Sequence, residues 1–154
     1  MPSGPELAPA RFDAPEVAAL VAAQQGELRG VDGEGDIGPA RDAAMFEEPH
    51  GAFLVARIDG RAVACGGVAR FDDARGELKR MYVEPALRGI GLGRRLLVAL
   101  EAEARRLGYT SMVLETGEAQ AEAIGLYVSA GYEPIPCYGV YATRDWSCCF
   151  EKGL

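Results

Sequence analysis

Apolar residues recur at helical spacing in several stretches of the chain. Leu92, Leu96 and Leu100 lie about one turn apart, which predicts an amphipathic helix that starts at Leu92. Asp13 is expected to cap an earlier helix, because Pro15 follows in its first turn and an apolar stripe comes after it. Together these signals predict helices over residues 13–30, 39–47, 92–107 and 119–130.

Short runs rich in apolar and β-branched residues predict the strands. The Asp59-Gly60 pair lies between two such runs and is typical of the turn of a β-hairpin. Gly66 and Gly67, inside the second run, predict a bulge or a close approach of another backbone. Strands are expected over residues 7–12, 52–58, 61–71, 77–83, 111–115, 132–141 and 146–151.

The order of these elements predicts a mixed α/β fold. One helix crosses over between the strands at residues 77–83 and 111–115, so these two strands are expected to be parallel. The strands joined by short turns are expected to pair antiparallel. We therefore expect a mostly antiparallel sheet with one parallel βαβ crossover. No repeat or linker interrupts the chain, which predicts a single domain over residues 1–154.

The composition narrows the classes of partner and compartment. A formal net charge of −7 argues against nucleic-acid binding, which needs a basic surface. No apolar run reaches membrane-spanning length, and residues 1–10 lack the layout of a signal peptide. We therefore expect a cytoplasmic protein without a nucleic-acid or membrane partner.

The cysteines and the single histidine show no metal-binding pattern. Cys65, Cys137, Cys148 and Cys149 form no C-x-x-C pair, and His50 is the only histidine, so no metal site is expected. All four thiols are predicted to be reduced and mostly buried. His50 is interpreted as a polar loop residue, with contact to an acceptor substrate as the alternative.

A glycine-rich turn, residues 88–94, joins the strand at 77–83 to the helix that follows. Gly89, Gly91 and Gly93 carry no side chain that would keep a ligand from the backbone. The first amides of the helix have no partner inside it and lie at the positive end of the helix dipole. This combination predicts an anion cradle, and a phosphate or pyrophosphate suits it best.

The motif in this turn is neither a Walker loop nor a dinucleotide fingerprint. No Lys follows the glycines, and Arg94 stands where the third fingerprint glycine would be. The turn reads R-x-x-G-x-G at Arg88, Gly91 and Gly93, after the strand E-L-K-R-M-Y-V and before A-I-G-L-Y-V-S-A-G-Y at residues 123–132. In these segments, which keep their order over residues 52–132, the sequence resembles the GNAT N-acetyltransferase superfamily.

The resemblance implies the GNAT acyl-CoA N-acyltransferase fold, with acetyl-CoA as the acyl donor. It also implies direct transfer of the acetyl group, within a ternary complex, to a primary amine of a small molecule or amino-acid-like acceptor. Gln120 departs from the Asn that many members have at the cofactor arm. Residues expected to bind the donor are Met81, Tyr82, Val83, Arg88, Gly89, Ile90, Gly91, Leu92, Gly93, Arg94 and Gln120.

By the same resemblance, three residues are catalytic candidates. Glu77 would be the general base, and Tyr127 would protonate the departing sulfur. The backbone N–H of Met81 would meet the thioester carbonyl. The alternative for Glu77 is an ion pair with Lys79 or an arginine at the strand end, and the alternative for Tyr127 is a core aromatic residue.

The identity of the acceptor stays open from sequence. Alternation places Glu77, Lys79 and Met81 on one face of their strand and Arg80 and Tyr82 on the other. The acidic, glycine-rich residues 30–38 lack the full pattern of a calcium loop. By the resemblance they are interpreted as a lid or an acceptor-site loop. Candidates for the acceptor pocket are Arg29, Lys79, Arg80, Tyr82, Glu115, Tyr138 and Tyr141.

Two other functions are compatible with the same motifs. One is a regulatory module that binds acetyl-CoA without turnover. The other is an acetyltransferase that modifies protein lysines or N-termini. The sequence also leaves open whether the protein forms a homodimer.

Overall fold

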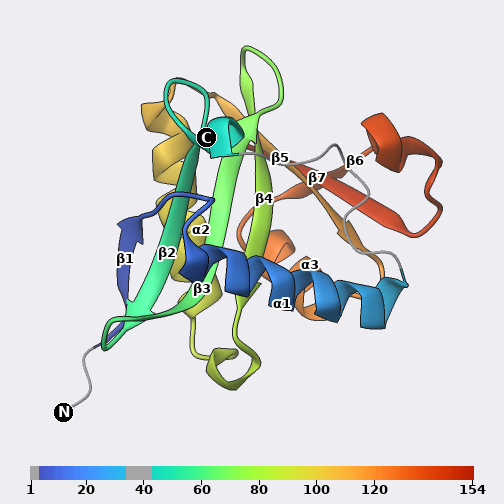
Figure 1. Ribbon diagram of the computed structural model, residues 1–154. Helices are drawn as coiled ribbons and strands as arrows, with labels where there is room; N and C mark the ends of the chain where they lie inside the picture. The colour runs from blue at the N-terminus through green and yellow to red at the C-terminus, as the bar shows by residue number, and fades with distance from the viewer. Residues whose placement is uncertain (1–3, 34–42) are drawn as a thin grey trace.

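A computed structural model describes residues 4–33 and 43–154. In this part of the chain, seven strands form one sheet in the order β1-β2-β3-β4-β5-β7-β6 (Figure 1). Every neighbouring pair is antiparallel except β4 and β5, which confirms the predicted mixed α/β fold with one parallel crossover. The strands are β1 (Glu6–Pro9), β2 (Ala52–Ile58), β3 (Arg61–Arg70), β4 (Arg75–Val83), β5 (Ser111–Gly117), β6 (Glu133–Ile135) and β7 (Ser147–Gly153).

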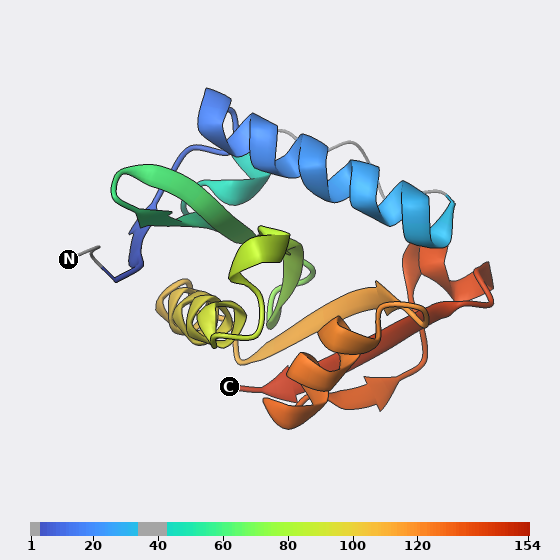
Figure 2. The same ribbon diagram turned by 90° about the horizontal axis from the view of Figure 1, so that it is seen from below.

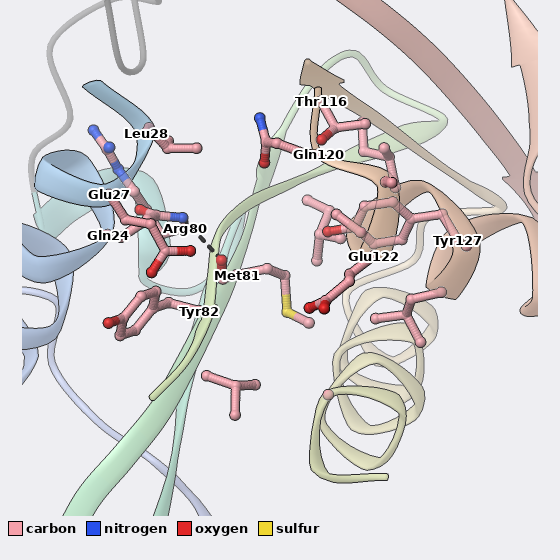
Figure 3. Close-up of a pocket in the computed structure, with 18 of the residues that line it drawn as sticks. Gln24, Glu27, Leu28, Arg80, Met81, Tyr82, Thr116, Gln120, Glu122 and Tyr127 are labelled. Atoms are coloured by element: carbon pink, nitrogen blue, oxygen red, sulfur yellow. Dashed lines mark hydrogen bonds between the residues drawn. The ribbon is translucent and has the colours of Figure 1, made fainter. Parts of the chain in front are cut away.

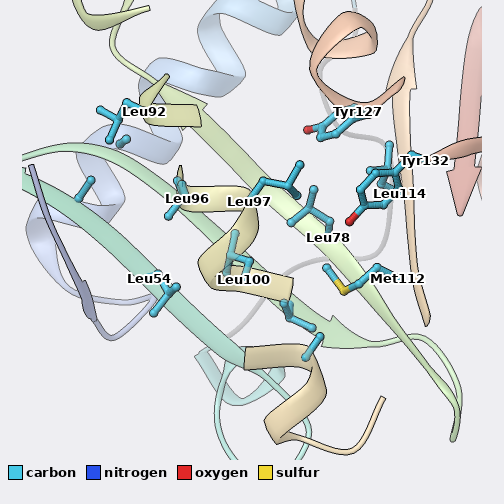
Figure 4. Close-up of a cluster of buried hydrophobic side chains, with 14 of the residues drawn as sticks. Leu54, Leu78, Leu92, Leu96, Leu97, Leu100, Met112, Leu114, Tyr127 and Tyr132 are labelled. Carbon is cyan, nitrogen blue, oxygen red and sulfur yellow. The ribbon is translucent and has the colours of Figure 1, made fainter. Parts of the chain in front are cut away.

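Helices cover both faces of the sheet. α1 (Pro15–Asp32) lies across one face, and α2 (Leu92–Arg106) and α3 (Ala121–Ser129) lie on the other (Figure 2). Leu96, Leu97 and Leu100 of α2 are fully buried in the larger apolar cluster, which we call the α2 cluster (Figure 4). Val17 and Leu20 of α1 pack in a second cluster on the opposite face, which we call the α1 cluster. None of the described helices has the length and apolar composition needed to cross a membrane.

The β2–β3 hairpin forms as predicted, and its turn shows why. Asp59 and Gly60 have φ values of 50° and 81°, the left-handed conformation that Asp and Gly tolerate best in such turns. At the start of α1 the prediction was wrong. Ala14 occupies the cap position without a side-chain hydrogen bond, while the Asp13 carboxylate accepts a bond of 2.9 Å from Arg11.

Several boundaries differ from the sequence prediction. The first strand ends at Pro9, and the expected helix at residues 39–47 is a 3₁₀ turn, Ala43–Phe46, with residues 39–42 outside the described part. The strand expected over residues 132–141 is limited to β6. Pro136, directly after β6, explains this, because proline cannot donate to a strand ladder. The chain then forms a 3₁₀ helix, Gly139–Thr143, before β7.

The cysteine prediction was wrong for two residues. Cys137 and Cys149 form a disulfide, with their Cα atoms 5.1 Å apart. The pairing of β6 with β7 brings them together, because Ile135 lies opposite Cys149 and Cys137 follows two residues later. Cys65, which is buried, and Cys148, which is half-buried, are free thiols as expected.

β4 contains a bulge opposite Gly66. Cys65 pairs with Tyr82 and Gly67 pairs with Lys79, so β4 has one more residue than β3 between these pairs. A Cβ on Gly66 would lie 2.7 Å from Leu100 and from Met81, which explains the glycine. The predicted bulge is therefore present, but its extra residue belongs to the facing strand.

The bulge also corrects the predicted faces of β4. Arg80 has a φ of 60°, a left-handed conformation that interrupts the alternation of side chains. Met81 consequently packs with Leu78 in the α2 cluster, and Tyr82 packs in the α1 cluster. Met81 thus lies on the face opposite Lys79, not on the same face as the sequence predicted.

Candidate functional site

The parallel strands β4 and β5 pair at one end and then separate, and we call the point of separation the fork. The strands pair only from Arg75–Ser111 to Glu77–Val113, and beyond this point they separate. A cavity of about 1070 Å³ lies between them and is lined by the second half of β4, the end of β5, α1 and α3 (Figure 3). We call this cavity the cleft. Because β5 does not pair with β4 here, the second half of β4 presents to the cleft a backbone edge that is not paired with β5.

At the far end of β4, the glycine turn leads into α2. Gly89 and Gly91 have φ values of 81° and 85°, which glycine adopts at little cost. A Cβ on either residue would meet no atom within 4 Å, so the turn borders open space. The first backbone bond of α2 runs from the amide of Arg95 to the carbonyl of Gly91 at 3.1 Å. The amides of residues 92–94 therefore precede the helical bonding pattern and suit a phosphate oxygen.

Arg88 joins this turn to α1. Its Nε donates to the Val83 carbonyl at 2.9 Å, and its Nη2 donates to Glu27 of α1 at 2.8 Å. The Glu27 carboxylate is the main cause that raises the pKa of Arg88. Arg94 donates to Ser129 of α3. Both arginines line the cleft, and both are also tied to neighbouring helices.

The backbone of Met81 is also held by α1. The side-chain amide of Gln24 donates to the Met81 carbonyl at 2.9 Å (Figure 3). This bond fixes the peptide that follows the Arg80 bulge. No local pattern in the sequence predicts this contact, because Gln24 and Met81 are 57 residues apart.

Tyr127 lies in α3 with its ring against Tyr132, at a centroid distance of 5.8 Å. It is only 7% exposed, and it lines the cleft. Burial raises the pKa of Tyr127, so the phenol stays neutral across the physiological range. Within the described part of the chain, nothing accepts a hydrogen bond from its hydroxyl group.

Glu77 lies at the point where β4 and β5 begin to separate. Its Oε2 atom is 3.1 Å from Lys79 Nζ, and the Tyr138 hydroxyl donates to the same oxygen at 3.2 Å. Lys79 also donates to the Tyr141 hydroxyl at 2.8 Å. Lys79 and Tyr141 line the cleft, whereas Glu77 does not.

A second carboxylate, Glu115 of β5, does line the cleft. Arg144 Nη2 and the Ser147 hydroxyl both donate to its Oε2 atom, at 2.6 and 2.7 Å. The Arg144 guanidinium also stacks over the Trp146 ring, 3.7 Å from its centroid. No described group bonds to the Oε1 atom of Glu115. The carboxylate therefore has one oxygen without a described partner.

The structure brings most of the predicted donor-site residues to one cleft. Glu77, Ile90 and Leu92 do not line it: Ile90 is 65% exposed, and Leu92 is buried in the α2 cluster. The predicted residues that line the cleft are Met81, Tyr82, Val83, Arg88, Gly89, Gly91, Gly93, Arg94, Gln120 and Tyr127.

The acceptor candidates divide in the same way. Arg29, Tyr138 and His50 do not line the cleft, and the predicted lid falls mostly on residues 34–38, outside the described part. Lys79, Arg80, Tyr82, Glu115 and Tyr141 do line it.

Sequence reasoning missed Gln24, Glu27, Thr116 and Arg144. Of these four residues, only Arg144 has a local pattern that could have drawn attention to it: the R-D-W run before β7 puts this arginine close to an aromatic residue in the sequence. Within the described ranges, no three His, Cys, Asp or Glu side chains are placed to hold a metal ion.

Comparison with known proteins gives a consistent result. The sequence profile of the acetyltransferase (GNAT) family matches residues 14–132. The chain is 40% identical over 126 residues to an IAA acetyltransferase from Azospirillum brasilense, covering 78% of this chain and 82% of that protein.

Solved structures share the fold. A Klebsiella pneumoniae protein assigned as an acyl-CoA N-acyltransferase is 31% identical, with a TM-score of 0.84 over 97% of both chains. A GNAT family acetyltransferase from Elizabethkingia anophelis, solved with acetyl-CoA bound, has the same fold at 15% identity. Its TM-score is 0.72, over 97% of this chain and 98% of that one.

Proposed function

This chain belongs to the GNAT family of acetyltransferases, and from that premise we propose that it moves an acetyl group from acetyl-CoA to a primary amine of a small-molecule or amino-acid-like acceptor. The observation that carries the proposal is the fork between β4 and β5. It leaves a strand edge that is not paired with β5, with a glycine turn at one end and ionised side chains at the other.

The residues present fit acetyl-CoA as the donor. The open space at Gly91 and the amides of residues 92–94 suit a pyrophosphate. No strand pairs with the edge at Met81–Val83, although Gln24 and Arg88 donate to its carbonyls. The backbone groups that these side chains leave unbonded suit the amide groups of an extended pantetheine arm, which would pair with this edge as an added strand does. When bound, acetyl-CoA supplies the acetyl group as a thioester that an amine can attack.

Residues of the cleft then have distinct roles. The backbone at Met81, fixed by Gln24 and the Arg80 bulge, orients the acyl end of the donor. Tyr127 holds a proton on a neutral phenol in the cleft and gives it to the departing thiolate. Gln120, at the start of α3, lines the same wall and is proposed to contact the donor arm.

The amine must lose a proton before it attacks. We assign this role to Glu115, because it lines the cleft and no described group bonds to its Oε1 atom, while Arg144 and Ser147 hold its Oε2 atom. Glu77, the candidate from the family resemblance, is engaged by Lys79 and Tyr138. In this assignment Glu77 fixes the position of Lys79.

Transfer is proposed to be direct. No cysteine is among the described residues that line the cleft, and burial raises the pKa of the Cys65 thiol to about 12. A covalent acyl-cysteine step therefore has no described thiolate to start from. The name of the Azospirillum brasilense relative supports a small molecule as the acceptor.

The test is thiol release from acetyl-CoA with a panel of amines, amino acids and protein substrates. Release with small amines alone supports the proposal. Release only with proteins, or binding of coenzyme A without any release, contradicts it.

Glu115→Gln should lower kcat about 100-fold, the size of a general-base contribution, while Glu77→Gln should lower it less. The reverse order would return the base to Glu77.

A further inference from the structure

One segment of the chain, residues 136–146, supplies three contacts to the ionised side chains at the fork. It leaves the sheet after β6 and returns at β7 (Figure 1). The Tyr138 hydroxyl donates to Glu77 at 3.2 Å, and the Tyr141 hydroxyl accepts from Lys79 at 2.8 Å. Arg144 donates to Glu115 at 2.6 Å.

The Cys137–Cys149 disulfide attaches this segment to the sheet. Cys149 of β7 lies directly opposite Glu115 of β5, so the two side chains share one face of the sheet. Cys137 is the second residue after β6, and the next residue is Tyr138. The crosslink therefore lies one strand away from Glu115 and next to the first contact of the segment.

We propose that this disulfide positions residues 136–146 as one wall of the acceptor site, so that its reduction weakens acceptor binding and leaves donor binding intact. This inference rests on the proposed function of the cleft. The pairing of β6 is only three residues long, and the Tyr138 ring contacts Phe71, with the centroids 4.8 Å apart. A crosslink between residues 12 apart restricts the conformations of the chain between them. Without it, the segment depends on non-covalent contacts, among them the three above and the contact between Phe71 and Tyr138.

Donor binding is expected to be independent of the segment for a geometric reason. The glycine turn and the start of α2 lie after the C-terminal end of β4, whereas Glu77 and Lys79 lie near the middle of that strand, where β5 separates from it. Arg88 and Met81 are held by Glu27 and Gln24 of α1, not by residues 136–146.

The redox step needs a dithiol as the reductant. Cys149 is 2% exposed and Cys137 is half-buried, so a thiolate of the dithiol attacks the Cys137 sulfur. The S–S bond breaks, and Cys149 leaves as a thiolate that takes up a proton. The second thiol of the reagent then displaces Cys137, which gives two protein thiols and one oxidised reagent.

The experiment compares oxidised protein with the same protein reduced by dithiothreitol, and adds a Cys137→Ala/Cys149→Ala variant. Cys148→Ala is the matched control, since Cys148 is adjacent to Cys149 but free. Alkylation after denaturation without reductant should label Cys65 and Cys148 only.

Reduction should raise the acceptor KM on the order of tenfold, a factor worth about 1.4 kcal/mol. The dissociation constant of coenzyme A should change less than about twofold, because a selective effect leaves donor contacts in place.

A readout without catalysis separates this inference from the proposed function. Deuterium uptake of residues 136–146 should rise on reduction, while uptake of the glycine turn stays constant. If no acceptor amine is found, the proposed function fails and this uptake decides the inference alone. Labelling of all four cysteines in untreated protein would overturn it. Unchanged uptake and KM, or an equal loss of coenzyme A affinity, would also overturn it.

Discussion

Tyr127 combines two properties that a proton donor in the cleft needs. Its ring is buried against Tyr132, and its hydroxyl bonds to no described group. Because burial raises its pKa, the phenol is neutral across the physiological pH range. Tyr127→Phe should therefore lower kcat about 100-fold and leave coenzyme A affinity within about twofold.

Tyr132→Phe is the matched control for this prediction. The Tyr132 hydroxyl donates to buried Glu101 at 2.9 Å and does not line the cleft. Its loss should destabilise the fold by about 1–3 kcal/mol with little effect on kcat. Steady-state kinetics and urea unfolding of both variants decide the matter. An unchanged rate in Tyr127→Phe would remove this residue from the mechanism.

A substitution of Gly91 tests whether the glycine turn binds the pyrophosphate. Its φ of 85° costs an L-residue about 1–2 kcal/mol, whatever the side chain meets. Gly108, which follows α2, has a φ of 96° and also has no atom within 4 Å of a Cβ. Gly91→Ala and Gly108→Ala should thus lose similar stability, while only Gly91→Ala should weaken coenzyme A binding. Calorimetric titration of both variants checks this, and equal affinities would argue against the turn as the pyrophosphate site.

At the scale of the element, the bulge in β4 depends on the left-handed conformation of Arg80. A β-branched residue tolerates this conformation poorly, and asparagine tolerates it well. Arg80→Val should therefore be less stable than Arg80→Asn by about 1–3 kcal/mol, and it should have the lower kcat. Both variants lose the guanidinium group, so the difference between their stabilities measures the cost of the left-handed backbone conformation at residue 80. Equal unfolding midpoints would show that the bulge does not depend on residue 80.

Local chemistry explains which elements could be predicted. The Asp59-Gly60 hairpin needs left-handed residues at adjacent positions, and the sequence supplies them there. The parallel crossover follows from a long helix between two strands. The bulge could be located from Gly66 but not assigned to a strand, because register depends on both strands together.

The remaining features depend on long-range packing. The disulfide joins Cys137 to Cys149 only because β6 pairs with β7, and spacing alone does not fix such a connection. The contact between Glu27 and Arg88 spans 61 residues and follows from the place of α1 on the sheet. The glycine turn and Tyr127 belong to contiguous motifs and could be identified from the sequence, whereas Gln24, Glu27 and Arg144 reach the cleft from distant parts of the chain.

For the whole molecule, the sheet divides the interior into two apolar clusters, and the cleft opens between them. The end of the cleft that is proposed to bind the donor is formed by α1, α2 and the end of β4. The other end is formed by β5 and residues 136–146. Tyr127 and Tyr132 pack against each other in the cluster on the α2 side of the sheet, and Tyr138 packs against Tyr141.

These three tyrosines make the folded state sensitive to alkali. Burial is the main cause that raises the pKa of each, and nearby carboxylates, Glu101 for Tyr132 and Glu77 for Tyr138, raise it further. In the unfolded chain a tyrosine loses its proton near pH 10, about its ordinary pKa, whereas the folded protein retains the proton. The native state then binds more protons than the unfolded state, so stability must fall as pH rises above about 10.

The contribution of these tyrosines to the melting temperature should accordingly be nearly constant from about pH 7 to 9. Above this range the melting temperature should decrease. Each tyrosine contributes at most about 1.4 kcal/mol per pH unit to the loss. Tyr138→Phe removes one titrating group together with its bond to Glu77. It should therefore start about 1 kcal/mol less stable at pH 8 but lose stability less steeply from about pH 10 to 11. Thermal unfolding of both proteins across this range tests the prediction. Parallel curves would show that Tyr138 ionises alike in both states, which would contradict its burial at the fork.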